Sequence, residues 1–210
     1  MDQVVVVSHP LVQHKLTQCR QKDTDSWEFR SLVEDITAMM LYEATRDLPF
    51  ETISLETPVG RGSGYLISGP QPVFIAVLRA GLGMLTGALR IFPAARAGHI
   101  GLYRDHDTFE PVEYYCKLPV GADQGDCYLL EPMLATGGSA IHAISLLKKK
   151  GIKRLKLMSL IASPEGIDAL RQSHPDVKIF LTAVDEKLDE KAYIVPGLGD
   201  AGDRLFGTES

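Results

Sequence analysis

The sequence predicts an α/β fold: a parallel twisted sheet with helices on both faces, N-terminal helices and a β-hairpin arm. Short apolar runs alternate with helical patterns from residue 73 to residue 183, an order typical of parallel sheets. The chain has 210 residues, of which 45% are hydrophobic and 23% charged, as in ordinary globular proteins. A chain of this length can bury a full core, so we expect a single domain over residues 1–210.

The N-terminal part is expected to be helical. Residues 10–21 fit a helix that Pro10 begins, because a proline in the first turn costs no helical hydrogen bond. Residues 28–47 fit a longer helix in which Leu32, Ile36 and Met40 recur at helical spacing. The glycine-rich stretch 60–64 and the pair Gly69-Pro70 predict loops.

Strands and helices then alternate along the chain. Strands are expected at residues 73–77, 99–104, 112–116, 127–130, 155–162 and 177–183, and helices at 84–91, 139–150 and 165–173. The strands 99–104 and 112–116 form the hairpin, with its bend at 105–107. Ligands of parallel sheets bind at the carboxyl ends of strands, so the loops after Val77, Leu130 and Ala162 are where we expect chemistry.

Composition excludes several classes of protein. Lys and Arg total 22 against 27 for Asp and Glu, and the net charge of −5 argues against a protein that coats nucleic acid. No apolar run approaches the length of a membrane helix, and the N-terminus lacks the pattern of a secretory signal. Three distant cysteines without a CxxC pair favour neither a disulfide framework nor a zinc site. We therefore expect a cytoplasmic protein without a membrane partner.

The segment 129–140 is the most informative in the chain. A strand ends, Glu131 follows, and a loop of small residues opens a helix. Gly137 and Gly138 let backbone N–H groups turn inward, Thr136 and Ser139 supply hydroxyls, and the helix N-terminus attracts anions. This pattern predicts a cradle for a phosphate dianion. A glycine turn needed only for geometry is the alternative.

Two commoner phosphate motifs do not match. The chain contains no G-x-x-x-x-G-K-[ST], which excludes a Walker loop. Gly81 and Gly83 are followed by Gly87, so the dinucleotide spacing is missed by one residue. A Rossmann oxidoreductase is therefore poorly supported.

The loop resembles the phosphoribosyl-pyrophosphate (PRPP) loop of type I phosphoribosyltransferases, and the chain resembles their uracil phosphoribosyltransferase family almost end to end. The stretches that carry this resemblance include Leu78-Arg-Ala-Gly-Leu-Gly-Met84, Gly98-His-Ile-Gly-Leu-Tyr-Arg-Asp105, Pro132-Met-Leu-Ala-Thr-Gly-Gly-Ser139 and Tyr193-Ile-Val-Pro-Gly-Leu-Gly-Asp-Ala-Gly-Asp203. The loop is shared by the superfamily, whereas the stretch 193–203 is specific to the uracil branch.

The resemblance implies that PRPP and uracil react to give UMP and pyrophosphate, with Mg²⁺ on the pyrophosphate. Displacement at the anomeric carbon has oxocarbenium character, so the protein's task is positioning and electrostatics. A mobile arm over the site, a homodimer or larger homo-oligomer and a GTP effector are also features of relatives. Whether GTP activates or UMP inhibits stays open.

The PRPP site is expected to centre on the loop. Glu131 is placed to accept hydrogen bonds from the ribose hydroxyls and to stabilise positive charge on the ring. Relatives typically carry Asp there, so Glu131 is a departure that adds about 1.3 Å of reach. The predicted PRPP-binding residues are Arg79, Arg104, Glu131, Pro132, Met133, Leu134, Ala135, Thr136, Gly137, Gly138, Ser139 and Asp200.

Two arginines are assigned to PRPP by the resemblance. Arg79 follows a buried strand, where a guanidinium needs an anion and pairs well with phosphate. Arg104 ends the first strand of the hairpin. A structural salt bridge for Arg79 and a solvated hairpin charge for Arg104 are the alternatives.

The stretch 197–203 is too rich in glycine for a regular element, and by composition it fits a flexible tail equally well. The alternative is a base pocket lined by backbone groups, which would reject cytosine because its pairing pattern is inverted at position 4. The resemblance places uracil at Ile194, Gly199, Asp200 and Ala201. It makes Asp200, Glu131 and Arg104 the catalytic candidates, and leaves Asp200 either orienting N1 or holding Mg²⁺.

Three other functions fit the sequence less well. Residues 148–156 carry six basic side chains and fit RNA binding, although lysines in a last helical turn also complement the helix dipole. A purine or orotate substrate conflicts with the stretch 193–203. An inactive relative finds support only in the departure at Glu131.

Overall fold

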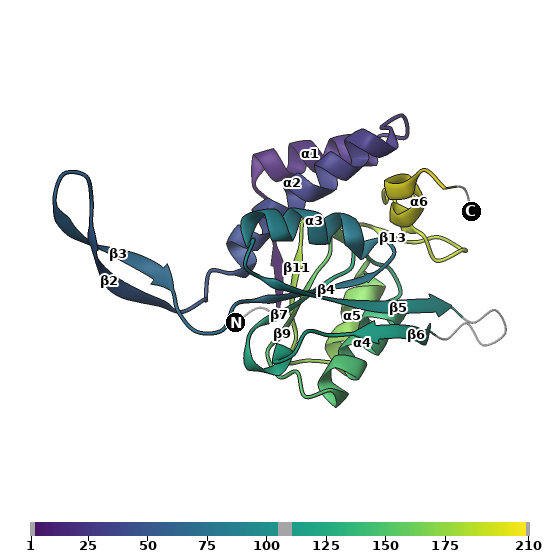
Figure 1. The fold of residues 1–210 in the computed structure, drawn as a ribbon. Coiled ribbons are helices and arrows are strands. Elements are labelled where there is room, and N and C mark those ends of the chain that lie inside the picture. The colour runs from purple at the N-terminus through teal and green to yellow at the C-terminus, as the bar shows by residue number, and fades with distance from the viewer. Residues whose placement is uncertain (1–2, 105–110, 209–210) are drawn as a thin grey trace.

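The computed structural model describes residues 3–104 and 111–208, built around a seven-stranded sheet (Figure 1). The strand order is β1-β11-β9-β7-β4-β5-β6, and every neighbouring pair is parallel except β5 and β6. These strands are β1 (Val4–Val6), β4 (Val73–Leu78), β5 (Arg96–Arg104), β6 (Pro111–Lys117), β7 (Cys127–Leu130), β9 (Leu155–Met158) and β11 (Lys178–Leu181). The predicted α/β fold is confirmed.

Helices cover both faces of this sheet (Figure 1). On one face lie α1 (Pro10–Arg20), α2 (Ser26–Ala44) and α3 (Gly81–Ile91), and on the other α4 (Gly138–Lys149) and α5 (Pro164–Ser173). Successive side chains of a strand point to opposite faces. Accordingly, Phe74 and Ala76 of β4 belong to the core under α1–α3, and Val73, Ile75 and Val77 to the core under α4 and α5.

The expected boundaries hold at most elements. The helix expected at 28–47 is α2, which begins at Ser26 because Asp25 caps its N-terminus by accepting a hydrogen bond from Glu28 N at 2.8 Å. It ends at Ala44, three residues before the expected end. The strand β1 was not predicted; it forms the edge of the sheet beside β11. None of the helices in the described part of the chain is long and apolar enough to cross a membrane.

The strands expected at 155–162 and 177–183 are each interrupted. Regular strand geometry is interrupted at Ser159 and Thr182, although backbone bonds continue there: Ser159 N donates to Phe180 O and Thr182 N to Leu160 O, each at 2.9 Å. The Thr182 hydroxyl also donates to Leu160 O at 2.6 Å. Beyond the break, β8 (Met133–Leu134), β10 (Ile161–Ala162) and β12 (Ala183–Val184) form a separate parallel sheet. The carboxyl edge of the main sheet therefore continues as three short strands, and the phosphate-loop residues Met133 and Leu134 form one of them.

The loop predicted at residues 60–64 is wrong for residues 61–64, whereas Gly60 does lie in a turn. These residues belong to a hairpin of β2 (Phe50–Glu56) and β3 (Arg61–Ile67) that projects from the body (Figure 1). Glycine is tolerated here because Leu55 lies across the strand against Gly64, where a Cβ atom would stand 2.7 Å from its Cδ2. The turn itself lies at Thr57 to Gly60, whose backbone groups bond each other.

The C-terminal part consists of a small hairpin and a short helix. The strands β13 (Lys187–Leu188) and β14 (Ile194–Val195) pair, and α6 (Ala201–Phe206) follows. The prediction that 197–203 contains no regular element is wrong from Ala201 onward. Asp200 caps α6 by accepting from Asp203 N at 2.9 Å, and Ala201 and Leu205 are fully buried, so capping and packing offset the glycines.

Candidate active site

The loops that follow β4 and β7 meet at the carboxyl edge of the sheet, as the topology requires. Three adjoining cavities lie there, with volumes of about 70, 250 and 480 Å³. Met133 and Ser139 line all three, and Asp200 lines the two larger ones. The predicted site residues from β4, the loop after β7 and the C-terminal segment are therefore brought together in space.

The smallest cavity is the cradle of the phosphate loop. It is lined by Glu131 and by every residue from Met133 to Ala140. Gly137 has a φ of +82°, the left-handed region that favours glycine, and α4 begins directly after it without a side-chain cap. Apart from Gly138 N, which is 3.4 Å from Thr136 Oγ1, the first N–H groups of α4 have no capping side chain, so the loop has the geometry that the predicted phosphate site requires.

Neighbouring elements hold this loop in shape. Ser163 Oγ donates to Ala135 O at 2.6 Å and accepts from Gly166 N at 2.9 Å, which caps α5. At Gly166 a Cβ atom would stand 2.3 Å from Ala135 O, so α5 packs directly on the loop backbone. Pro132 is buried and its carbonyl accepts from Leu160 N at 2.9 Å. The cradle is therefore fixed before any ligand arrives.

Glu131 follows β7 and lines both the phosphate cradle and the 250 Å³ cavity. Its Oε2 is buried and has no hydrogen-bond partner among the described residues. Burial raises the pKa of this carboxyl to about 8, because removal from water disfavours the charged form. This oxygen, beside a cavity, is available to a water molecule or a ligand that donates a hydrogen bond.

Arg79 lies at the mouth of the 250 Å³ cavity, which also contacts Ala80, Leu102 and Gly202. Its Nη2 is 3.3 Å from Asp203 Oδ1, and the guanidinium lies 5.8 Å from the centre of the Phe206 ring. The side chain is 56% exposed, so the expected buried guanidinium is not observed and the ion pair contributes little stability. Arg79 is thus free to turn to a stronger anion.

Arg104 ends β5, but its side chain and the predicted bend at 105–107 lie outside the residues that the structure describes. Of the three tyrosines of this hairpin, Tyr103 and Tyr114 pack their rings 6.3 Å apart, and Tyr115 is half exposed.

The largest of these three adjoining cavities, of about 480 Å³, borders the C-terminal segment. Ile194 and Asp200 line it, together with Lys191, Ala192 and Tyr193, which sequence reasoning did not assign. Gly199 has a φ of +76°, which lets the chain turn into Asp200, whereas the Ala201 side chain points into the core. Two of the four predicted uracil residues therefore line this cavity, and the other two flank Asp200.

In this parallel sheet a buried strand is followed by an acidic residue and a glycine loop that opens a helix, and two further cavities adjoin that loop. This arrangement defines the class of type I phosphoribosyltransferases. Solved structures agree at the level of the fold. A hypoxanthine phosphoribosyltransferase from Staphylococcus aureus superposes with a TM-score of 0.51 at 13% identity, covering 79% of this chain and 83% of that one.

Relatives with higher sequence identity identify the family within this class. The sequence profile described as uracil phosphoribosyltransferase matches residues 6–208. Proteins named uracil phosphoribosyltransferase from Halalkalibacterium halodurans and Symbiobacterium thermophilum are each 56% identical over 209 residues and cover both chains completely. A solved structure from Aquifex aeolicus has a TM-score of 0.89 at 38% identity and covers 98% of this chain and 99% of that one.

The chain belongs to the uracil phosphoribosyltransferase family. The predicted enzyme class, a pentosyltransferase of this specificity, is confirmed.

Proposed function

We propose that the three cavities divide the two substrates between them. The phosphate cradle takes the 5′-phosphate of PRPP, the 250 Å³ cavity its ribose and pyrophosphate, and the 480 Å³ cavity uracil. The observation that carries this assignment is that Met133 and Ser139 line all three cavities and Asp200 lines the two larger ones. Because the cavities adjoin, a base in the third would have its N1 next to the anomeric carbon of a ribose in the second.

In this arrangement N1 of uracil bonds to the anomeric carbon while the bond to pyrophosphate breaks. The bonding electrons leave with pyrophosphate, and the N1 proton passes to solvent. Glu131 receives the ribose hydroxyls at its unsatisfied Oε2, and Arg79 turns from Asp203 to the pyrophosphate. The N–H groups of the cradle hold the 5′-phosphate and thereby fix the position of the ribose.

Asp200 and, once it has lost its proton, Glu131 fit the Mg²⁺ that the family resemblance implies. No cluster of three or more His, Cys, Asp or Glu side chains that could hold a metal occurs among the described residues. Glu131 and Asp200 nevertheless line the same cavity, and Mg²⁺ usually takes one or two carboxylates together with substrate phosphates. When bound, the metal neutralises charge on the leaving pyrophosphate.

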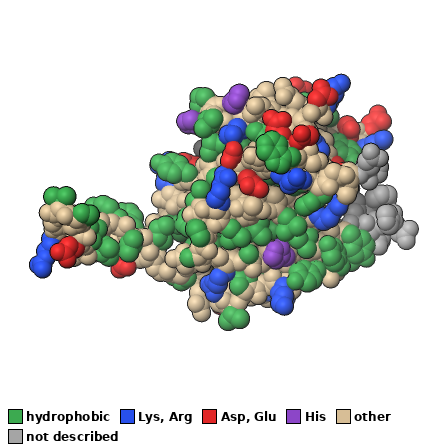
Figure 2. All heavy atoms as spheres, turned by 45° about the horizontal axis from the view of Figure 1, so that its top comes forward, with side chains coloured by type: hydrophobic (Ala, Val, Ile, Leu, Met, Phe, Trp, Pro, Cys, Tyr) green, Lys and Arg blue, Asp and Glu red, His purple; other side chains and the backbone are tan. Residues whose placement is uncertain are grey.

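RNA binding has less support. Of the basic residues at 148–156, Lys148 pairs with Asp176 at 2.6 Å, and Lys156 is buried with its ammonium bonded to Ala44 O and Asp47. On the face drawn in Figure 2, Lys and Arg side chains are scattered among acidic ones rather than gathered into one basic surface.

The assembly and regulation follow from the resemblance. We expect one phosphoribosyltransferase domain that forms a homodimer or larger homo-oligomer in the cytoplasm. Exposed apolar residues of the projecting hairpin, among them Phe50, Val59 and Tyr65, support self-association. GTP as an effector stays a prediction, which initial rates with and without GTP test.

The deciding experiment is UMP formation from uracil and PRPP in the presence of Mg²⁺, with cytosine and hypoxanthine as controls. We expect turnover with uracil alone. Equal turnover with cytosine would contradict a base cavity built on uracil's hydrogen-bonding pattern.

A further inference from the structure

We propose that Arg20 and Asp185 are positioning residues for uracil, because together they hold the backbone on both sides of the Gly197 Cα and with it the wall of the base cavity. The inference rests on the proposed assignment of that cavity to uracil. Neither residue lines any of the three cavities, so neither touches a substrate.

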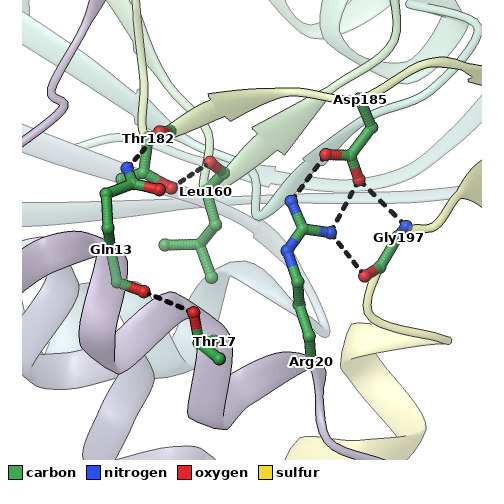
Figure 3. Close-up of polar contacts among 7 residues, drawn as sticks. All are labelled: Gln13, Thr17, Arg20, Leu160, Thr182, Asp185 and Gly197. Atoms are coloured by element: carbon green, nitrogen blue, oxygen red, sulfur yellow. Dashed lines mark hydrogen bonds and ion pairs between the residues drawn. The ribbon is translucent and has the colours of Figure 1, made fainter.

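Both polar groups of the Gly197 backbone are bound by side chains (Figure 3). The N–H donates to Asp185 Oδ2 at 2.9 Å, and the carbonyl accepts from Arg20 Nη1 at 2.6 Å. Gly197 lies three residues after Ile194 and three before Asp200, both of which line the base cavity. Its φ is +63°, and a Cβ atom would stand 2.1 Å from Ile194 O, so the turn is tight. The two peptide units that meet at Gly197 are therefore both held, and their orientation sets the course of the chain from Ile194 to Asp200.

Arg20 and Asp185 also bind each other through two parallel hydrogen bonds. Arg20 Nη2 is 2.5 Å from Asp185 Oδ1, and Arg20 Nη1 is 2.7 Å from Asp185 Oδ2. The Asp185 side chain is only 5% exposed and that of Arg20 22%. Only the planar fork of a guanidinium can meet both carboxylate oxygens and still reach the Gly197 carbonyl. The three groups thus form one rigid unit.

This unit is anchored to the sheet through α1 (Figure 3). Gln13 Nε2 donates to Thr182 O at 2.7 Å, and Thr182 is itself tied to Leu160. Arg20 ends the same helix, while Asp185 follows β12 and its N–H donates to Ala162 O at 2.8 Å. Both partners are therefore held by the carboxyl edge on which the active site stands.

A second arginine supports the next residue of the segment. Arg204 of α6 donates to Leu198 O at 2.9 Å and to Gln21 O at 2.6 Å, directly after α1, and its guanidinium lies 4.3 Å from the centre of the Phe29 ring. The N-terminal helices consequently support the base cavity, whereas the phosphate cradle is held by α5 and β10. This division predicts that disturbing Arg20 or Asp185 affects uracil and spares PRPP.

The test uses Arg20→Lys, which keeps the charge but loses the fork, and Asp185→Asn, which keeps the shape but loses the charge. We expect the KM for uracil to rise about tenfold in each, the effect of losing one well-placed hydrogen bond, while the KM for PRPP stays within about twofold. Lys15→Gln is the matched control: Lys15 lies on the same helix and pairs with Asp35 at 2.9 Å, away from the site. It is expected to lower the melting temperature without changing either KM.

Three results would overturn the inference: folded variants with an unchanged KM for uracil, equal changes in both KM values, or loss of folding in both conservative variants. The last would show a pair needed for the whole fold. Failure of the proposed function is read separately, in the unmodified protein, as absence of UMP formation.

Discussion

Glu131 shows how one residue connects packing with chemistry. Its carboxyl is buried at the end of β7 with one oxygen unsatisfied, and burial raises its pKa to about 8. Between its unfolded pKa, near 4.3, and about 8, the folded protein holds a proton that the unfolded chain releases. The free energy of unfolding therefore falls as pH rises through this window, by at most about 1.4 kcal/mol per pH unit from this group.

We expect Glu131→Gln to remove that slope, which melting curves of the ligand-free protein from pH 5 to pH 8 measure. A slope identical to that of the unmodified protein would contradict the assignment of the raised pKa to Glu131.

In activity assays, Glu131→Asp should retain turnover and Glu131→Ala should lose most of it. Full activity of the Ala variant would exclude a role of Glu131 with the ribose.

Arg79 is half exposed and only weakly paired with Asp203. Arg79→Ala should raise the KM for PRPP about tenfold or more and change the KM for uracil less, because a hydrogen bond to a charged group is lost. Arg90→Ala, which removes an exposed arginine that pairs with Asp35 on α2, serves as the control. Unchanged PRPP kinetics in Arg79→Ala would point to a purely structural ion pair.

Asp200 lies where the ribose and base cavities meet. Asp200→Asn keeps an oxygen that can cap α6, so the fold should persist while kcat falls about tenfold or more from loss of the charge. Steady-state kinetics measure kcat of Asp200→Asn, and Asp168→Asn, at an exposed position on α5, serves as the control. Unimpaired turnover would argue against both N1 orientation and metal binding.

At the scale of elements, the phosphate cradle depends on how closely α5 packs against it. Gly166→Ala would bring a Cβ atom within 2.3 Å of Ala135 O, so the loop or the helix must shift. We expect a loss of about 1–3 kcal/mol in stability and a raised KM for PRPP. Urea unfolding measures the stability and initial rates measure the KM for PRPP, with the exposed neighbour Glu165→Ala as control. An unchanged stability together with an unchanged KM for PRPP would show that the cradle tolerates the shift.

The projecting β2–β3 hairpin is the element least accounted for by the body of the protein. A two-stranded hairpin is marginally stable alone, and this one exposes Phe50, Val59 and Tyr65. We expect Phe50→Ser with Tyr65→Ser to shift the sedimentation coefficient toward that of a monomer. Trp27→Ser, at an exposed position on α2, should leave it unchanged. A monomeric unmodified protein would contradict the predicted homo-oligomer.

At the scale of the whole molecule, a chain of net charge −5 is proposed to bind a strongly anionic substrate. The structure places the means of doing so locally, in backbone N–H groups, a helix N-terminus and Arg79 along one sheet edge. Global charge governs long-range steering, whereas a cradle of oriented dipoles acts at hydrogen-bond distance. The two therefore do not conflict.

The sequence by itself determined the alternation of strands and helices, the glycine loop before α4 and the place of Glu131 at the end of β7, because these depend on local periodicity and on a single continuous stretch, 131–139. The predictions for the glycine-rich stretches 60–64 and 197–203 were wrong in part, because cross-strand packing in the projecting hairpin and burial of α6 override the local preference of glycine. Only the tertiary structure decided how Arg20 meets Asp185, 165 residues away, and how Ile194 and Asp200 come to line one cavity with Met133 and Ser139. Such contacts depend on how strands are ordered in the sheet, and no local pattern in the chain encodes that distance.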